Sequence, residues 1–339
     1  MAQRKYGAQT PDMTDKSISF KFLNTRLIYL IIFSLHLSEV NGQLFRMERF
    51  WKYYRSGFYI GGGITNFLGE LGGRDQIGSP FIYDLELVAT RPAFQIGYFY
   101  HLSQDVTIMF QGFWGILTGA DSLTKEMFRH NRNIHFKTNV WEFSIMGRYK
   151  FIQEKPGHRY KLRKVRGRKA FIFGVYLQSG LAFFLFEPKA QYKGKWYKLR
   201  LLHTEGQGLK PGTKPYKPYS FAIPLTFGFT YAFDLKNRIE LEVSWRKTFT
   251  DYIDDTSTEY YDPQILKSKY GEAAAYFSNP CLCQEDWAKW STKPGQQRGD
   301  PRDKDAYITL MINYVKYIRS GGGPKAPRWF TKRKARPSF

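Results

Sequence analysis

The chain has 339 residues and a formal net charge of +23, with 42% hydrophobic and 18% aromatic residues. Two cysteines cannot supply a disulfide framework, so the composition excludes a small disulfide-held scaffold. The basic balance leaves three classes of partner open, namely nucleic acid, an anionic membrane and an acidic protein.

The N-terminal region predicts export. An apolar run at 27–35 follows three basic residues, Lys16, Lys21 and Arg26. The run is too short for a transmembrane helix of about 20 residues, but it suits a secretory hydrophobic region of about 7–15 residues. We therefore expect a signal peptide at 1–42, cleaved before Gln43, with Met13 as an alternative start. A buried core helix is the competing interpretation, and export argues against a nucleic-acid partner.

The chain after Gln43 opens with a predicted periplasmic arm, 43–56, in which 45–54 has the basic and aromatic character of an interfacial helix. Eight segments with every-other-residue apolar patterning follow, and this period of two predicts β-strands. The segments are 57–66, 91–102, 106–116, 134–151, 171–185, 221–233, 239–246 and 305–318. Long polar connections alternate with short turns, apart from the basic connection 152–169. We expect 187–219 to be a loop.

The clearest strand is 221–233, where large apolar residues occupy every odd position. The intervening positions hold small or weakly polar residues: Ala222, Pro224, Thr226, Gly228, Thr230 and Ala232. The run exceeds the usual strand of about five or six residues and matches a tilted membrane-crossing strand of about 9–11 residues. Either lipid or a second sheet must cover its aromatic face.

These features predict an all-β protein, an eight-stranded antiparallel transmembrane outer-membrane β-barrel at 57–318, with long loops on one side and a basic tail at 319–339. A soluble two-sheet sandwich is the alternative. The face opposite the apolar one carries five charges: Glu142, Arg148, Glu240, Glu242 and Arg246. An eight-stranded barrel has room only for side chains inside, so we expect these charges to pair as a plug.

The basic residues gather in two segments that share one side of the barrel if both termini are periplasmic. We predict that they dock an acidic periplasmic partner, because complementary charge steers association; the alternative is solvated charge beside lipid headgroups. The residues expected to dock the partner are Arg159, Lys161, Arg163, Lys164, Arg166, Arg168, Arg328, Lys332, Arg333 and Lys334.

Several stretches resemble the PorG family of outer-membrane barrels, a component of the type IX secretion system of the Bacteroidetes. The matching pieces are 66–73, 84–87 with 90–94, 204–209, and 246–258 with 260–262. The last of these is the most specific, and the resemblance extends over 57–317. It implies a non-enzymatic protein that ties the periplasmic ring of PorN and the lipoprotein PorK to the outer membrane, with outer-membrane lipid around it. The alternative is a barrel that binds or transports a small molecule or lipid.

Two further groups of residues need an account. Asp251, Asp254 and Asp255 cluster in the family-like segment, where a turn that caps backbone amides is favoured over a calcium site, because the spacing is not that of an EF-hand. Cys281 and Cys283 could form an internal bridge, stay as free thiols, bridge to another chain or bind zinc. We expect no catalytic site, cofactor or bound metal, because no phosphate-loop, nucleophile-elbow or dinucleotide motif is present.

Overall fold

The computed structural model describes residues 50–69, 71, 87–124, 126–154, 172–233 and 236–319. These residues belong to one compact unit, 47–339. The predicted signal peptide lies outside the described residues, as do residues 43–49 of the predicted arm and the tail from residue 320 onward.

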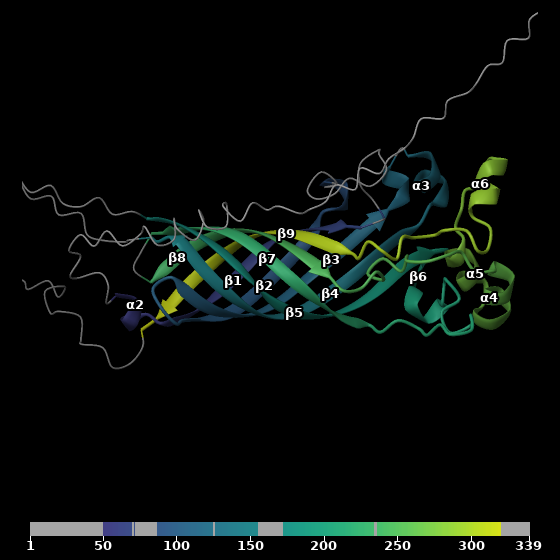
Figure 1. Cartoon of the computed structure of the whole chain (residues 1–339). Coiled ribbons are helices and arrows are strands. Elements are labelled where there is room, and N and C mark those ends of the chain that lie inside the picture. Colours follow the sequence, from purple (N-terminus) through teal and green to yellow (C-terminus); the bar gives the residue numbers. More distant parts are fainter. Residues whose placement is uncertain are drawn as a thin grey trace, which may run out of the picture. The chain divides into compact units, whose positions relative to one another are not determined.

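Nine strands are found in this described part of the chain (Figure 1). They are β1 (Ser56–Leu68), β2 (Arg91–His101), β3 (Val106–Ala120), β4 (His135–Ile152), β5 (Phe173–Tyr192), β6 (Lys195–Lys198), β7 (Tyr219–Ala232), β8 (Asn237–Thr248) and β9 (Ala306–Ile318). Each strand pairs with its neighbour in antiparallel register, and the pairing of β4 with β5 closes the sheet on itself. The predicted eight-stranded antiparallel barrel is confirmed, and β6 is an additional strand that pairs only with β5.

The barrel has two different ends, which we call the turn end and the loop end. The turn end carries the tight connections after β2 and β7, the start of β1 and the finish of β9. The loop end carries β6 and the connections after β3, β6 and β8, whereas the connection between β4 and β5 leaves from the turn end. Helices α3 (Met127–Arg132), α4 (Pro263–Tyr270), α5 (Glu272–Ser278) and α6 (Asp286–Ser291) lie at the loop end, whereas the single turn α2 (Phe50–Tyr53) lies at the turn end (Figure 1). The same described ranges also contain the 3₁₀ turns η2 (Leu87–Ala89), η3 (Asp121–Leu123) and η4 (Leu199–Leu202).

The prediction of a loop at 187–219 is partly wrong. Strand β5 continues to Tyr192 and turns back through Gly194, whose positive φ of 79° suits a tight hairpin, into β6. The inward residues Phe186 and Ala190 stay buried against the loops of this end, so the hydrophobic core continues past the predicted strand limit. We call residues 135–140 of β4, residues 186–192 of β5 and all of β6 together the wall.

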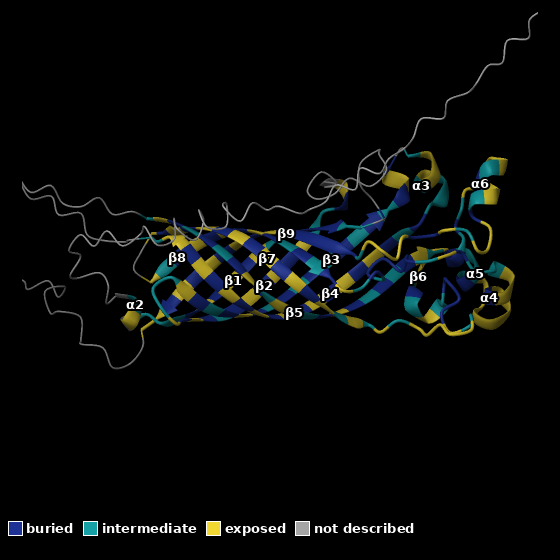
Figure 2. Cartoon of the chain, in the orientation of Figure 1, coloured by how far each residue is buried: buried dark blue, intermediate teal, exposed yellow. Residues whose placement is uncertain are grey.

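Exposed and buried residues alternate around the barrel, as the checkered colouring in Figure 2 shows. On β7 every odd residue from Phe221 to Tyr231 is exposed and every even residue is buried. Aromatic side chains gather near both rims of the outward surface, with Trp141 and Phe221 toward the loop end and Tyr149 and Tyr231 toward the turn end. An apolar band between aromatic girdles is the surface of a transmembrane barrel, because lipid covers it without loss of hydrogen bonds.

Among the described residues, no helix combines the length and the apolar composition that crossing a bilayer would require.

The outward belt should tolerate charge at its edge and resist it at its centre. Ile145 faces outward from the middle of β4 and is 60% exposed. We expect Ile145→Lys to destabilise the folded barrel by about 2–4 kcal/mol, the cost of a cation at the bilayer midplane. Asn139→Lys, on the same face of β4 in the wall, is the matched control and should change stability by less than about 1 kcal/mol. Urea titration of the barrel in vesicles measures both, and equal stability of the two variants would contradict a lipid-facing belt.

Candidate functional site

The interior of the barrel is charged because of strand parity. The even-numbered residues of β4 and β8 point inward, so both strands place acids and bases at successive levels of the lumen. All five charges predicted to face inward are buried there: Glu142, Arg148, Glu240, Glu242 and Arg246. The structure also places them in ion pairs with one another.

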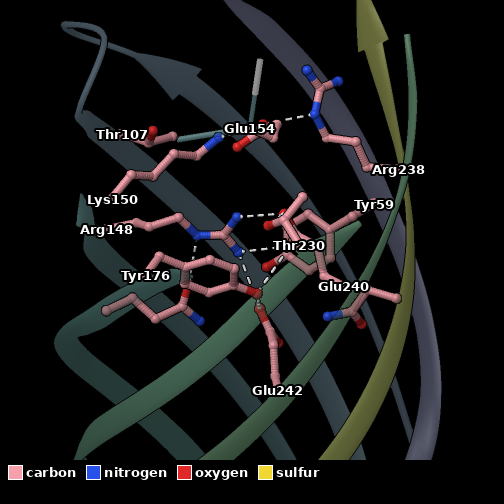
Figure 3. Close-up of polar contacts among 12 residues, drawn as sticks. Tyr59, Thr107, Arg148, Lys150, Glu154, Tyr176, Thr230, Arg238, Glu240 and Glu242 are labelled. Carbon is pink, nitrogen blue, oxygen red and sulfur yellow. Dashed lines mark hydrogen bonds and ion pairs between the residues drawn. The ribbon is translucent and has the colours of Figure 1, made fainter. Parts of the chain in front are cut away.

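Arg148 is the centre of the largest cluster. Its guanidinium donates two hydrogen bonds to Glu240, at 2.8 and 3.0 Å, and one to Glu242 at 3.0 Å. The remaining donor, Nε, binds Gln178 at 3.0 Å. Figure 3 shows Arg148 and Glu240 pointing toward one another across the lumen. Because each guanidinium nitrogen has an acceptor and two carboxylates face the charge, the cluster avoids the penalty of an uncompensated interior charge.

Tyr176 completes this cluster from β5. Its hydroxyl donates to Glu242 at 2.7 Å and also lies 3.1 Å from Glu240, and its ring stacks on the Arg148 guanidinium at 3.7 Å (Figure 3). The ring crosses Gly228, where an added Cβ would lie 2.2 Å from it. The small residues on the inner face of β7 therefore have a function in packing, since they make room for this tyrosine.

A second ion pair lies toward the loop end. Arg246 Nε donates to Glu142 at 2.8 Å, and the Tyr307 hydroxyl donates to the same carboxylate oxygen at 2.5 Å. The guanidinium also binds Thr309 at 2.7 Å and lies over the ring of Phe113. Between this ion pair and the loop end, the lumen is filled by a hydrophobic cluster that includes Phe184, Phe186 and Ile253.

A third cluster, near the turn end, was not predicted. Glu154, two residues past the end of β4, accepts from Lys150 at 2.9 Å and from Arg238 at 2.7 Å. Figure 3 shows Glu154 between the two cations. Burial alone would raise the pKa of Glu154, but the two cations lower it to about 2. We call this arrangement the Glu154 clamp. The inward parity of Lys150 and Arg238 could have revealed two of its members, but no local pattern marks Glu154.

Together the three clusters bring four carboxylates against four cations, so the described lumen is balanced in charge. A large hydrophobic cluster lies on the loop-end side of the ion pairs, and a smaller one, which includes Met146, Val315 and Tyr317, packs beside those nearer the turn end. A lumen filled in this way acts as a packed core and not as an aqueous channel.

The loops at the loop end form a second buried polar centre, which we call the cap: residues 121–134, 199–218 and 249–305. Arg298 donates to Glu205 at 2.9 Å and to the main-chain oxygen of Asp255 at 2.5 Å. Glu205 also accepts from the amides of Ser257 and Thr258, at 2.8 and 3.1 Å. Two of the segments that resemble PorG, 204–209 and 246–258, are therefore in direct contact.

The three aspartates of the family-like loop are buried within the cap. Asp251 accepts from the Ser257 hydroxyl, and Asp254 accepts from the Thr256 amide. Asp255 accepts from the hydroxyls of Thr204 and Tyr216, both at 2.6 Å. These contacts are those of a structured turn, and the described residues contain no group of three or more His, Cys, Asp or Glu arranged to hold a metal ion.

The two cysteines are joined to each other in the structure. The Cys281–Cys283 bridge closes a small loop whose central residue, Leu282, donates its amide to Asn131 of α3 at 2.9 Å. Next to it, Phe128 of α3 packs edge-on against Trp287 of α6, with 4.9 Å between ring centroids. The bridge therefore lies where two loops of the cap meet.

All the basic residues predicted to dock a periplasmic partner lie outside the described residues. These are Arg159, Lys161, Arg163, Lys164, Arg166, Arg168, Arg328, Lys332, Arg333 and Lys334. The strands that flank both segments, β4, β5 and β9, end or begin at the turn end. The prediction that the basic residues form a docking surface stays a prediction.

Comparison with known proteins adds a general likeness. No protein-family model and no curated protein matches the chain. Among solved structures, Neisserial surface protein A aligns with 77% of this chain and 97% of its own at 7% identity and a TM-score of 0.34. OprG of Pseudomonas aeruginosa aligns with 79% and 98% at 8% identity and a TM-score of 0.33. Outer membrane protein W of E. coli aligns with 78% and 100% at 10% identity and a TM-score of 0.30. The assignment of the fold rests on the strand pairing and apolar belt described above.

The Glu142–Arg246 pair allows a test of the plug. Arg246→Met leaves the Glu142 carboxylate without its cation and should destabilise the barrel by about 3–5 kcal/mol. Adding Glu142→Gln removes the orphaned charge and should recover most of that loss. Urea titration of all variants in vesicles measures the difference, and an unchanged stability for Arg246→Met alone would show that the pair is not buried as described.

The cap should depend on pH through Asp255. Burial raises the pKa of Asp255 from 3.8 to about 6, against the opposing effect of Arg298. Because the pKa of Asp255 is higher in the folded protein than in the unfolded chain, the contribution of this carboxyl group to the stability of the cap is fully present below about pH 4. That contribution is lost as the pH rises through 6. A shift of about two units corresponds to an upper bound near 3 kcal/mol. Burial raises the pKa of Asp251 to about 6 as well, which adds a change of the same sign.

Hydrogen exchange of the Ile253 and Ser257 amides, corrected for the intrinsic effect of pH, measures the opening free energy of the cap. It should fall between pH 4 and pH 7 in the wild type, and fall less in Asp255→Asn. Glu259→Gln, which neutralises an exposed carboxylate of the same loop, is the control and should match the wild type. Identical profiles for all three proteins would contradict the role given to Asp255.

Proposed function

We propose that this chain is a non-enzymatic outer-membrane component of the type IX protein secretion system, and that it anchors the periplasmic ring of PorK and PorN to the membrane. The observation that carries this proposal is the filled lumen. A barrel whose interior is occupied by paired charges and packed aromatic rings offers a rigid membrane body for attachment. It offers a dissolved solute no aqueous path through the bilayer.

The segments that resemble PorG support the specific assignment. The two that meet in the cap, 204–209 and 246–258, supply Glu205 and Asp255, whose buried contacts join distant loops. A resemblance concentrated in residues that hold the loop end together is expected when relatives share that architecture.

The strand order supports the side on which the ring would dock. If the turn end is periplasmic, the basic connection after β4 and the basic tail after β9 both leave the barrel on that side. Their positive charge would steer an acidic ring protein toward the membrane. The Glu154 clamp fixes the start of the first segment at the barrel mouth.

The alternative, a barrel that transports or binds a small molecule or lipid inside, is supported less well. It requires a partly apolar lumen that a ligand can enter. The ion pairs of Arg148 and Arg246 occupy that space, and a ligand would have to separate buried charges to enter.

Co-purification from a detergent extract tests the proposal. The intact protein should recover PorK or PorN, and deletion of residues 320–339 should weaken this recovery. The intact complex should also lose more partner than the deletion variant does when salt is raised, because salt screens the charges that the deletion removes. Lys267→Gln with Lys269→Gln, two exposed lysines of α4 at the loop end, is the control and should recover the ring normally. Recovery of the barrel alone at low salt would refute the anchoring role.

A further inference from the structure

The outward face of the wall carries three lysines side by side on three neighbouring strands. Lys137 of β4 pairs in register with Lys189 of β5, and Lys189 pairs in register with Lys198 of β6. Directly opposite residues on antiparallel strands have Cβ atoms about 4.5–5.5 Å apart, and like charges at this distance repel. We call these three residues the lysine ladder.

The neighbourhood of the ladder compensates this charge only in part. One carboxylate, that of Glu187, lies 2.8 Å from the Lys198 ammonium and 3.5 Å from that of Lys189. Lys137 lies 5.6 Å from the ring centroid of Trp196, which is exposed, and on the β3 side its register partner is Thr118. The ladder therefore keeps a net positive charge on a surface that the fold holds rigid.

The ladder is continuous with the lipid belt. On the same two strands and the same face, Trp141 and Leu185 pair in register at the upper edge of the belt, four residues below Lys137 and Lys189. Four residues span about 13 Å along a strand, or roughly 9 Å along the membrane normal at a tilt near 45°. The headgroup layer extends about 5–7 Å beyond the hydrocarbon on each side. Long lysine side chains can reach back toward the interface, and the ammonium groups of Lys189 and Lys198 both contact Glu187, two residues nearer the belt than Lys189, which brings them toward the level of the phosphates.

We propose that the lysine ladder binds the phosphorylated headgroup of a lipid in the leaflet around the loop end. The occupant is anionic because the ladder is cationic, and it is a lipid because the site begins where the lipid-covered belt ends. A headgroup with more than one phosphate fits best, since the three ammonium groups are spread across three strands and, in the part of the chain that the structure describes, a single carboxylate pairs with them. The exposed Trp196 indole, next to Lys137, would pack at the same interface.

This inference does not depend on the secretion role, because it needs only the membrane-spanning barrel. If the intact protein binds lipid at the ladder but recovers no ring protein, only the proposed function is overturned. If the ladder variant binds lipid as well as the control variant while the intact protein still recovers the ring, only the lysine ladder is overturned.

The test is a binding titration of the intact protein in neutral detergent with lipid A, which carries two phosphates, followed by native mass spectrometry. The ladder variant is Lys137→Gln, Lys189→Gln and Lys198→Gln. The control variant removes the same charge from exposed loop-end lysines away from the wall, namely Lys214→Gln, Lys267→Gln and Lys269→Gln. Since a lysine near an anionic surface contributes a several-fold change in affinity, the ladder variant should bind at least about tenfold more weakly, and the control should stay within about twofold of the wild type.

Two further measurements keep the result decisive. The heat-dependent shift of a folded barrel on a denaturing gel shows whether each variant is folded. If the triple variant does not fold, Lys189→Gln alone replaces it, and this single change should weaken binding about threefold. An excess of inorganic phosphate should leave lipid A bound. Equal binding by the ladder and control variants would overturn the proposal, and so would displacement of lipid A by inorganic phosphate alone, because the site would then take free phosphate.

Discussion

The structure depends on the pairing of charges inside a barrel that lipid surrounds. Arg148 faces a lumen without bulk water, so its charge must be matched by protein groups, and Glu240, Glu242 and Gln178 together accept from its guanidinium. A single unpaired ion at this depth would cost several kcal/mol. This requirement fixes the levels at which β4 and β8 carry acids and bases, and it fixes their register, since a slip of one residue would turn the charges toward lipid.

The cap solves the same problem with loops in place of strands. Its segments come from three separate connections, and loops of this length would leave many buried polar groups if they packed without partners. Glu205 and Arg298 supply those partners, each binding main-chain groups as well as one another. The loop end is thus an ordered polar core built above a hydrophobic one, which gives the barrel a closed top as well as a filled lumen.

The sequence predicts much of this, for identifiable reasons. Alternation in β7 and β8 reveals which side chains face lipid, because the period of two holds along both strands from residue 221 onward, and the inward charges of β8 follow from the same parity. The course of the loops is less predictable: the hairpin of β5 and β6 lies in a stretch rich in Lys, Gly and Pro. Contacts such as that of Thr204 with Asp255 join residues far apart in the chain, and no local pattern encodes them. The clamp at Glu154 belongs to the same class, since its partners lie on β4 and β8.

That clamp has a mechanical consequence. Pulling on the chain just past β4 would by itself peel this strand from β3 and β5, starting with the hydrogen bonds at the turn end. Glu154 is held by Arg238 as well as by Lys150, so the same force reaches β8 across the lumen at once. The load is shared between non-adjacent strands, and the barrel resists traction as a unit.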